Sequence, residues 1–166
     1  MAGARFLAVQ LDGRALLIDA RVIQEVIGQC ESVDVPHQSG ELDGIFLWNG
    51  RAIPLVSLGN LASSGSEQAS LSSHSARKRK RTLIFHAAGE WAGLAVDDAS
   101  EIVELTQAQL LPVRHNPGPF ATHEVDDGET IRSVIDLHAV VSRILALSSQ
   151  RDGAFEQAQA GSGGAA

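Results

Sequence analysis

Short apolar stretches of this chain alternate with clusters of turn residues. Residues 6–11 and 15–18 are rich in β-forming apolar side chains, and Asp12-Gly13 separates them. Because both turn residues tolerate positive φ angles, this region predicts a tight hairpin of two antiparallel strands. A second hairpin is predicted over residues 44–56, around Asn49-Gly50, since Asn-Gly is the preferred dipeptide of the type I′ turn.

The pattern between the two hairpins is less regular. Asp19 predicts the cap of a short helical turn that contains residues 22–27. A strand is then expected to reach Val33 and Val35, and Pro36 should end it.

Strand alternation in the second hairpin separates its apolar residues into two faces. Phe46 and Trp48 are expected on one face, with Ile45 and Leu47 on the other. If both faces are apolar, one of them is expected to meet a partner. Pro54 cannot donate a hydrogen bond to a sheet, so its strand is predicted to lie at an edge or to carry a bulge.

The second half of the chain repeats the order of the first. Residues 82–96 form another predicted hairpin, Asp97-Asp98 is expected to cap a short turn, and residues 121–135 hold the last hairpin. Five correspondences mark the repeat: Gly13 with Gly89, Asp19 with Asp97, Glu25 with Glu101, Gly50 with Gly128, and Ser57-Leu58 with Asp136-Leu137. The repeat predicts two small all-β units of about five strands each, which share a core because each buries too little surface alone. The seam between them is expected to form a groove.

Three segments outside the hairpins have a composition of their own. Residues 137–147 place apolar side chains at helical spacing and predict an amphipathic helix. Residues 148–166 consist largely of Gly, Ala, Ser and Gln and predict a disordered tail. Residues 62–81 are rich in Ser and end in the basic run 77–81, which predicts a flexible linker. That run could contact nucleic acid or anionic lipid, but the acidic body on both sides favours a solvated linker.

The charge and composition favour protein partners over nucleic acid or membranes. The formal net charge is −7, although five of the 13 basic residues lie in the single basic run. The rest of the chain is therefore strongly acidic and repels phosphate, and the lack of Tyr argues against a base-stacking surface. Cys30 is the only cysteine, no signal peptide is evident, and no apolar run approaches the ~20 residues of a membrane span. A cytoplasmic protein without membrane insertion is expected.

No motif for catalysis, metal or cofactor binding is evident in the sequence. The six histidines have none of the spacings typical of zinc sites, and no G-x-S-x-G motif is present. Asp97-Asp98 and Asp126-Asp127 could suggest acid–base chemistry, but turn and cap roles explain both pairs better. Cys30 is interpreted as a small apolar filler near a strand. We expect no catalytic, metal-binding or cofactor-binding residue.

Four segments in order resemble the CheW family of chemotaxis adaptors, over residues 5–147. The segment 44–58 follows the family's Gly, apolar strand, Gly turn and Pro-broken strand, and residues 92–103 resemble its second-half signature. Residues 22–27 with Pro36, and Ile135-Asp136-Leu137, resemble the early turn and the final strand-to-helix junction. The resemblance implies an all-β fold of two intertwined five-stranded SH3-like barrels with short helices and a C-terminal helix. Subdomain one would span about 15–80 and subdomain two about 82–135, with the termini crossing between them.

The resemblance also implies a function. The family has no enzymatic activity and links the cytoplasmic tips of methyl-accepting chemoreceptors to the regulatory domain of a CheA-type histidine kinase. This chain would then be a cytoplasmic scaffold recruited to membrane-bound receptor arrays. A receptor's helical hairpin would dock at the groove between barrels, and one barrel would meet one barrel of the kinase domain.

The partner-binding residues implied by the resemblance fall into two groups. The groove residues are Val26, Val33, Val35 and Pro36, and those in and around the second hairpin are Gly44, Leu47, Asn49 and Gly50. The chain departs from the family at three places, with Asn49 in place of Arg, Leu47 in place of Asn, and Ser57 in place of Asp. Asn cannot replace the bidentate donor of an Arg, so receptor pairing is expected to differ from the family pattern in this chain.

Other readings of the same residues stay open at this point. The stripe from Val26 to Val35 could be core or interface, and Phe46, Leu47 and Trp48 share this ambiguity. The alternative function is a divergent SH3-like binding module for another protein partner, and a small enzyme ranks last.

Overall fold

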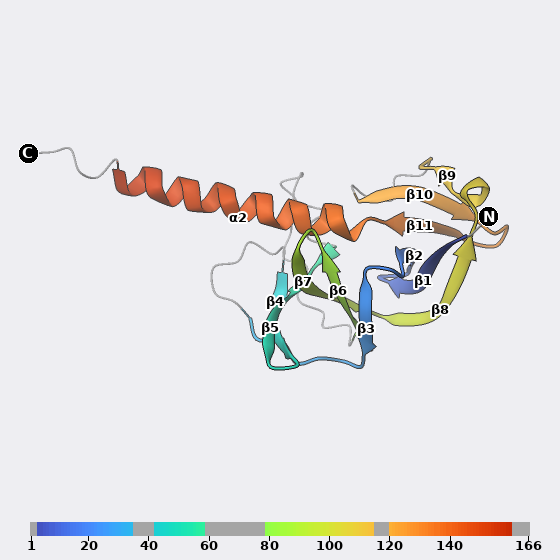
Figure 1. Ribbon diagram of the computed structural model, residues 1–166, viewed down its shortest axis with the longest axis horizontal. Coiled ribbons are helices and arrows are strands. Elements are labelled where there is room, and N and C mark those ends of the chain that lie inside the picture. Colours follow the sequence, from blue (N-terminus) through green and yellow to red (C-terminus); the bar gives the residue numbers. More distant parts are fainter. Residues whose placement is uncertain (1–2, 35–41, 59–78, 115–119, 161–166) are drawn as a thin grey trace, which may run out of the picture.

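The computed structural model describes residues 3–34, 42–58, 79–114 and 120–160, and it describes side chains as far as Gln150. Val35, Pro36 and most of the expected linker 62–81 lie outside the described residues. The described chain forms two β-sheets and one long helix (Figure 1), which confirms the predicted all-β class with a C-terminal helix.

The first sheet contains five strands. Its order is β3 (Ile23–Ile27), β6 (Arg81–Ala87), β7 (Glu90–Val96), β5 (Arg51–Val56) and β4 (Leu42–Trp48). Val33, which follows β3, exchanges two backbone hydrogen bonds with Ile45 of β4, at 2.8 and 3.0 Å. The chain that leaves one edge strand therefore joins the other edge, and the sheet closes around its own interior. We call this sheet the first barrel.

The second sheet contains six strands. Its order is β8 (Asp98–Leu105), β1 (Ala4–Leu11), β2 (Arg14–Asp19), β11 (Ile131–Ile135), β10 (Ala121–Asp126) and β9 (Leu111–Pro112). A 3-10 helix, η1 (Gln107–Gln109), connects β8 to β9, which pairs with β10 as Val33 pairs with β4. We call this sheet the second barrel.

The two repeats exchange strands. In sequence β3 follows the hairpin β1–β2, yet it pairs with β6, while β8 follows the hairpin β6–β7 and pairs with β1. The last strand of each repeat runs parallel to the other repeat's hairpin, β5 beside β7 and β11 beside β2. The barrels are thus intertwined as expected, but they do not divide at 80–82. The first barrel takes strands from residues 23–96, and the second takes those on both sides of that range.

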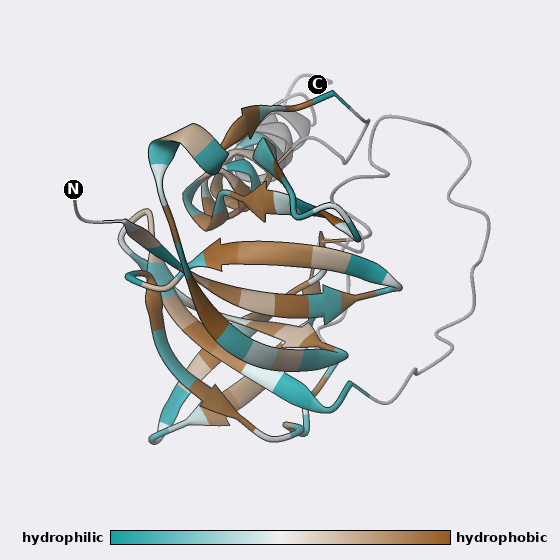
Figure 2. Ribbon diagram, turned by 90° about the vertical axis from the view of Figure 1, so that its right-hand side faces the viewer, coloured by the Kyte–Doolittle hydropathy of each residue, from teal (hydrophilic) through white to brown (hydrophobic). Residues whose placement is uncertain are grey.

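Three cores result from this exchange. Phe46, Ile53, Leu55 and Ile84 fill the first barrel, and a set around Phe6, Leu17 and Val134 fills the second. The largest core lies between the barrels and includes alternate residues of the central strands, such as Ile18 and Phe85, together with Val140 of the helix α2 (Leu137–Ala160). Because the central hairpin strands are buried on both faces, they read as continuous apolar runs. Figure 2 shows these apolar strands with hydrophilic residues at several of the turns.

Several local predictions need correction. Residues 23–27 are strand β3 and not a helical turn, because β6 offers them a partner strand. Asp97-Asp98 cap no helical turn, since β8 begins at Asp98. Pro54 lies in β5, inside the sheet, but β5 pairs with β7 only at Leu55 and Val56, so its missing N–H interrupts no bond there.

The C-terminal helix is longer than predicted. It begins at Leu137, as expected, but continues to Ala160, so residues 148–160 are not a disordered tail. The segment carries Ala, Gln, Arg and Glu, which favour helix, and it continues a helix already nucleated on the core by Val140 and Val141. The helix projects away from the barrels (Figure 1).

Candidate functional site

An exposed apolar stripe lies on the outside of the first barrel, where its edges close. Leu47 is 75% exposed and Val33 is 73% exposed. Phe46, which lies between Ile45 and Leu47 in β4, is only 3% exposed. Val33 pairs with Ile45, so Val33, Ile45 and Leu47 point to the same outer face. The predicted separation of Phe46 from Ile45 and Leu47 is therefore correct, and the second face is apolar and uncovered among the described residues.

The closure beside the stripe depends on glycine at position 44. Gly44 has φ +138°, in a region that side chains rarely adopt, and a Cβ there would lie 2.8 Å from the carbonyl oxygen of Val33. Any larger residue would push Val33 away from β4. Gly44 thus sets the position of Val33 within the stripe.

The hairpin turn beyond Leu47 has the predicted geometry. Asn49 and Gly50 have φ angles of +48° and +74°, as a type I′ turn requires. Both residues are exposed at the end of the β4–β5 hairpin. The turn therefore presents Asn49 to solvent at the end of the exposed stripe.

The structure brings together only some of the residues predicted to bind a partner. Val33, Gly44, Leu47, Asn49 and Gly50 lie along β4 and its turn, whereas the partner of Val26 is Leu83 of the buried core between the barrels. Val26 is 41% exposed at the margin of that core. The seam between the barrels is filled by this core, so Val33 and Leu47 lie on the outer face of one barrel instead of inside a groove.

An aromatic cluster at one end of the first barrel was not predicted. The rings of Trp48 and Trp91 lie 5.1 Å apart between centroids, and His86 lies 4.9 Å from Trp91. The guanidinium of Arg51 lies 5.7 Å from the centre of the Trp91 ring, and the indole Nε1 of Trp48 donates a 2.9 Å hydrogen bond to Glu25 Oε2. These residues come from all five strands, so only the sheet order brings them together.

The end of the basic run is docked against the body. Arg79 is half-buried and forms ion pairs with Asp12 at 2.9 Å and with Asp97 at 2.6 Å. Burial works to lower the pKa of Arg79, but the hydrogen bond to Asp97 and the two carboxylate charges raise it overall. Asp97 also accepts a 2.7 Å hydrogen bond from the backbone N–H of Asp12. The expectation of a solvated run is therefore wrong for Arg79, and Arg81 belongs to β6.

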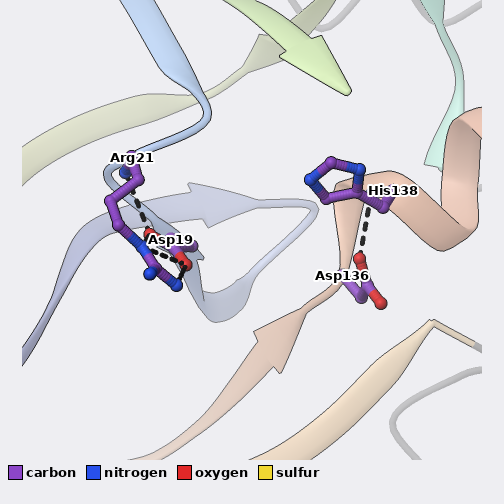
Figure 3. Close-up of polar contacts among 4 residues, drawn as sticks. All are labelled: Asp19, Arg21, Asp136 and His138. Carbon is purple, nitrogen blue, oxygen red and sulfur yellow. Dashed lines mark hydrogen bonds and ion pairs between the residues drawn. The ribbon is translucent and has the colours of Figure 1, made fainter. Parts of the chain in front are cut away.

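Polar contacts fix two junctions, the one that follows β2 and the one between β11 and α2 (Figure 3). Asp19 at the end of β2 accepts hydrogen bonds from the backbone and side chain of Arg21, and these lower its pKa, led by the side-chain bond. Asp136 accepts bonds from the backbone N–H groups of His138 and Ala139 and so caps α2. The imidazole Nδ1 of His138 accepts a 3.0 Å bond from the backbone N–H of Ala88. These groups hold turns together.

The remaining carboxylate pair has the same kind of role. Asp126 accepts a bond from the backbone N–H of Gly128, and Asp127 accepts bonds from Glu129 and Thr130, which lower the pKa of Asp127. Within the described ranges, no three His, Cys, Asp or Glu side chains are grouped so that they could hold a metal ion. None of the described helices combines the length and apolar character needed to cross a bilayer.

Comparison with known proteins adds to this geometry. A sequence model of the family described as "CheW-like domain" matches residues 5–145. The crystal structure of the scaffolding protein TtCheW from Thermoanaerobacter tengcongensis matches with a TM-score of 0.67 and 20% sequence identity, over 84% of this chain and 88% of that chain. The search of curated proteins gave no match. The structural likeness shows a shared fold, and the sequence match covers both barrels.

Proposed function

This chain belongs to the CheW-like domain family, and we propose that it is a non-catalytic adaptor that couples chemoreceptors to a CheA-type histidine kinase. It would act in the cytoplasm, at the receptor arrays. The observation that carries the proposal is the exposed apolar stripe at the closure of the first barrel. Val33 and Leu47 are each about three-quarters exposed on one sheet face together with Ile45, and a contiguous exposed apolar patch of this kind marks an interaction site.

The stripe suits a helical partner. Val33 and Leu47 lie on one face with Ile45, and Val26 lies at the margin of the core between the barrels. A receptor tip, which is a helical hairpin, could place apolar side chains of successive turns against such a face. Val35 and Pro36 remain part of the proposed contact from the sequence alone, and Asn49 and Gly50 would border it.

The absence of an Arg at position 49 points to a specificity that differs from the family pattern. Leu47 and Asn49 stand where the family places Asn and Arg, so the contact here is more apolar and lacks a guanidinium. A more apolar receptor surface would match this change. The same observation supports the alternative that the stripe binds another protein.

Binding of a receptor-tip fragment to the purified full chain tests the proposal. Isothermal titration calorimetry should show binding that Val33→Glu and Leu47→Glu each weaken at least tenfold, because each buries a charge without a partner. Leu145→Glu is the matched control, since Leu145 is an exposed apolar residue of α2 away from the stripe. Binding of a receptor fragment that all three variants retain would contradict the proposal.

A further inference from the structure

The second barrel contains a pocket of about 450 Å³. Its floor is apolar and includes Leu17, Val103 and Val125, while Glu101, Asp127 and Arg132 are among the residues at its rim. The volume is within the range of pockets that hold a small molecule or a large side chain. Because the chain consists of two repeats, the first barrel shows what occupies the equivalent place.

The equivalence of the last hairpins follows from their registers. β4 carries a bulge between Leu42 and Gly44, opposite the end of β5. β10 carries the equivalent bulge between Ala121 and His123, opposite the end of β11. Trp48 lies four residues after Gly44, and Asp127 lies four residues after His123. Asp127 of the second barrel therefore stands where the first barrel has Trp48.

The acidic residue on the edge strand is the same in both barrels. Ile23 of β3 pairs with Phe85, and Glu25 lies two residues after Ile23. A bulge in β3 separates Ile23 from Glu25. Glu101 lies two residues after Ala99, in a strand whose partner β1 has its register shift at the same point. Glu25 accepts the indole N–H of Trp48. No hydrogen bond or ion pair of the Glu101 carboxylate occurs among the described residues.

The second tryptophan is also missing from the second barrel. Trp91 is the second residue after the turn glycine Gly89, and Ala15 is the second after Gly13. Two indoles in the first barrel are thus replaced by Asp127 and Ala15 in the second. Asp127 lines the pocket, and Ala15 lies two residues before the lining residue Leu17, on the same side of β2. Glu101, Asp126 and Asp127 outnumber the single cation Arg132, which pairs with Asp127 at 3.1 Å.

From this comparison we infer that the second barrel binds a tryptophan side chain of a partner protein, in the place that Trp48 and Trp91 occupy in the first. The indole ring would lie against Leu17, Val103 and Val125, and its N–H would donate to Glu101, as Trp48 donates to Glu25. The acidic rim favours a segment with Lys or Arg beside the tryptophan. The inference uses contacts within this chain and is independent of the proposed coupling to receptors.

Titration of the full-length ¹⁵N-labelled chain with tryptamine tests the inference. Tryptamine joins an indole to a cation, and indole-3-acetate carries the same ring with the opposite charge. Tryptamine should give saturable shifts at the amides of Val103, Val125 and neighbouring residues, with indole-3-acetate at least fivefold weaker. Shifts that cluster around Trp48 and Trp91, or no saturable shift at the second barrel, would overturn the inference.

Three variants complete the test. Ala15→Trp should fill the pocket from within and abolish the shifts, and Glu101→Gln should weaken binding roughly fivefold by removing the charged acceptor. Glu104→Gln is the matched control on the same strand and should leave binding unchanged, because Glu104 does not line the pocket. Equal binding by Glu101→Gln and Glu104→Gln would contradict the assignment even if Ala15→Trp failed to fold.

Discussion

The indole of Trp48 and the carboxylate of Glu25 join the two edge strands of the first barrel through a 2.9 Å hydrogen bond. β4 and β3 stand at opposite ends of the sheet order, and Val33 and Ile45 link the same two edges through the backbone. Among the described residues, closure of this barrel therefore involves the Trp48–Glu25 bond, the backbone bridge between Val33 and Ile45, and a 3.5 Å bond from the Ser32 hydroxyl to the Asp43 carbonyl. The exposed stripe lies on the outer face of this closure.

Trp48→Phe should lower the free energy of unfolding by about 1 kcal/mol, because it keeps an aromatic ring and removes the indole donor. Urea unfolding of the purified chain measures the change. Leu47→Ala, at the adjacent exposed position, is the control and should change stability by no more than about 0.5 kcal/mol. Equal effects of the two substitutions would show that the Trp48–Glu25 bond contributes nothing to closure.

Gly93→Ala should destabilise the chain by about 1–3 kcal/mol through overpacking. A Cβ at Gly93 would lie 2.5 Å from the Phe46 ring, which leaves no room for a methyl group. Phe46→Leu should restore part of the loss in the double variant, so a double-mutant cycle should show coupling. Gly28→Ala is the control, since its Cβ would meet nothing within 4 Å. Additive effects at Gly93 and Phe46 would be inconsistent with this packing.

Arg79→Gln should lower stability by about 1 kcal/mol, because one guanidinium joins the β1–β2 turn at Asp12 to the β7–β8 junction at Asp97. The difference from the wild type should shrink in 1 M salt, as screening weakens both ion pairs. Lys80→Gln, at an exposed neighbouring position, should have little effect. A loss at Arg79 that does not depend on salt would point to packing of its stem.

The Asp19–Arg21 pair should contribute to the acid sensitivity of the chain. In the folded chain the pKa of Asp19 lies below the ordinary value of 3.8, mainly because the Arg21 side chain donates a hydrogen bond to the Asp19 carboxylate. The pair therefore stabilises the fold above that value, and the contribution is lost as the pH falls through the folded pKa. Thermal unfolding should show a shallower loss of stability below about pH 4 in Asp19→Asn than in the wild type. Arg21→Gln should give the same shallower slope, and an unchanged slope in both would refute the assignment.

The sequence predicted those features that depend on local pattern. Asp12-Gly13 and Asn49-Gly50 identified their hairpins because positive φ angles limit which residues can form such turns. The duplication was visible in paired glycines and acids, and the CheW resemblance agrees with the family match over residues 5–145. Strand alternation also placed Phe46 and Leu47 on opposite faces, of which the structure buries the first and exposes the second.

Features that depend on which strand meets which were not predicted. Both β3 and β8 could in principle pair with their own repeat, and an apolar pattern is the same for either partner. The contact of Trp48 with Glu25, across 23 residues, follows only once the barrel closes. The extension of α2 to Ala160 was missed because its composition resembles a disordered tail when the preceding nucleated turns are ignored.

Sedimentation velocity of the chain mixed with a receptor-tip fragment and a CheA-type kinase tests the adaptor role most directly. The account predicts that the receptor fragment and the kinase sediment together only when this chain is added. Val33→Glu and Leu47→Glu should each abolish this ternary complex, and Leu145→Glu should preserve it. Independent sedimentation of all three components at tens of micromolar would contradict it, as would a ternary complex that persists with both stripe variants.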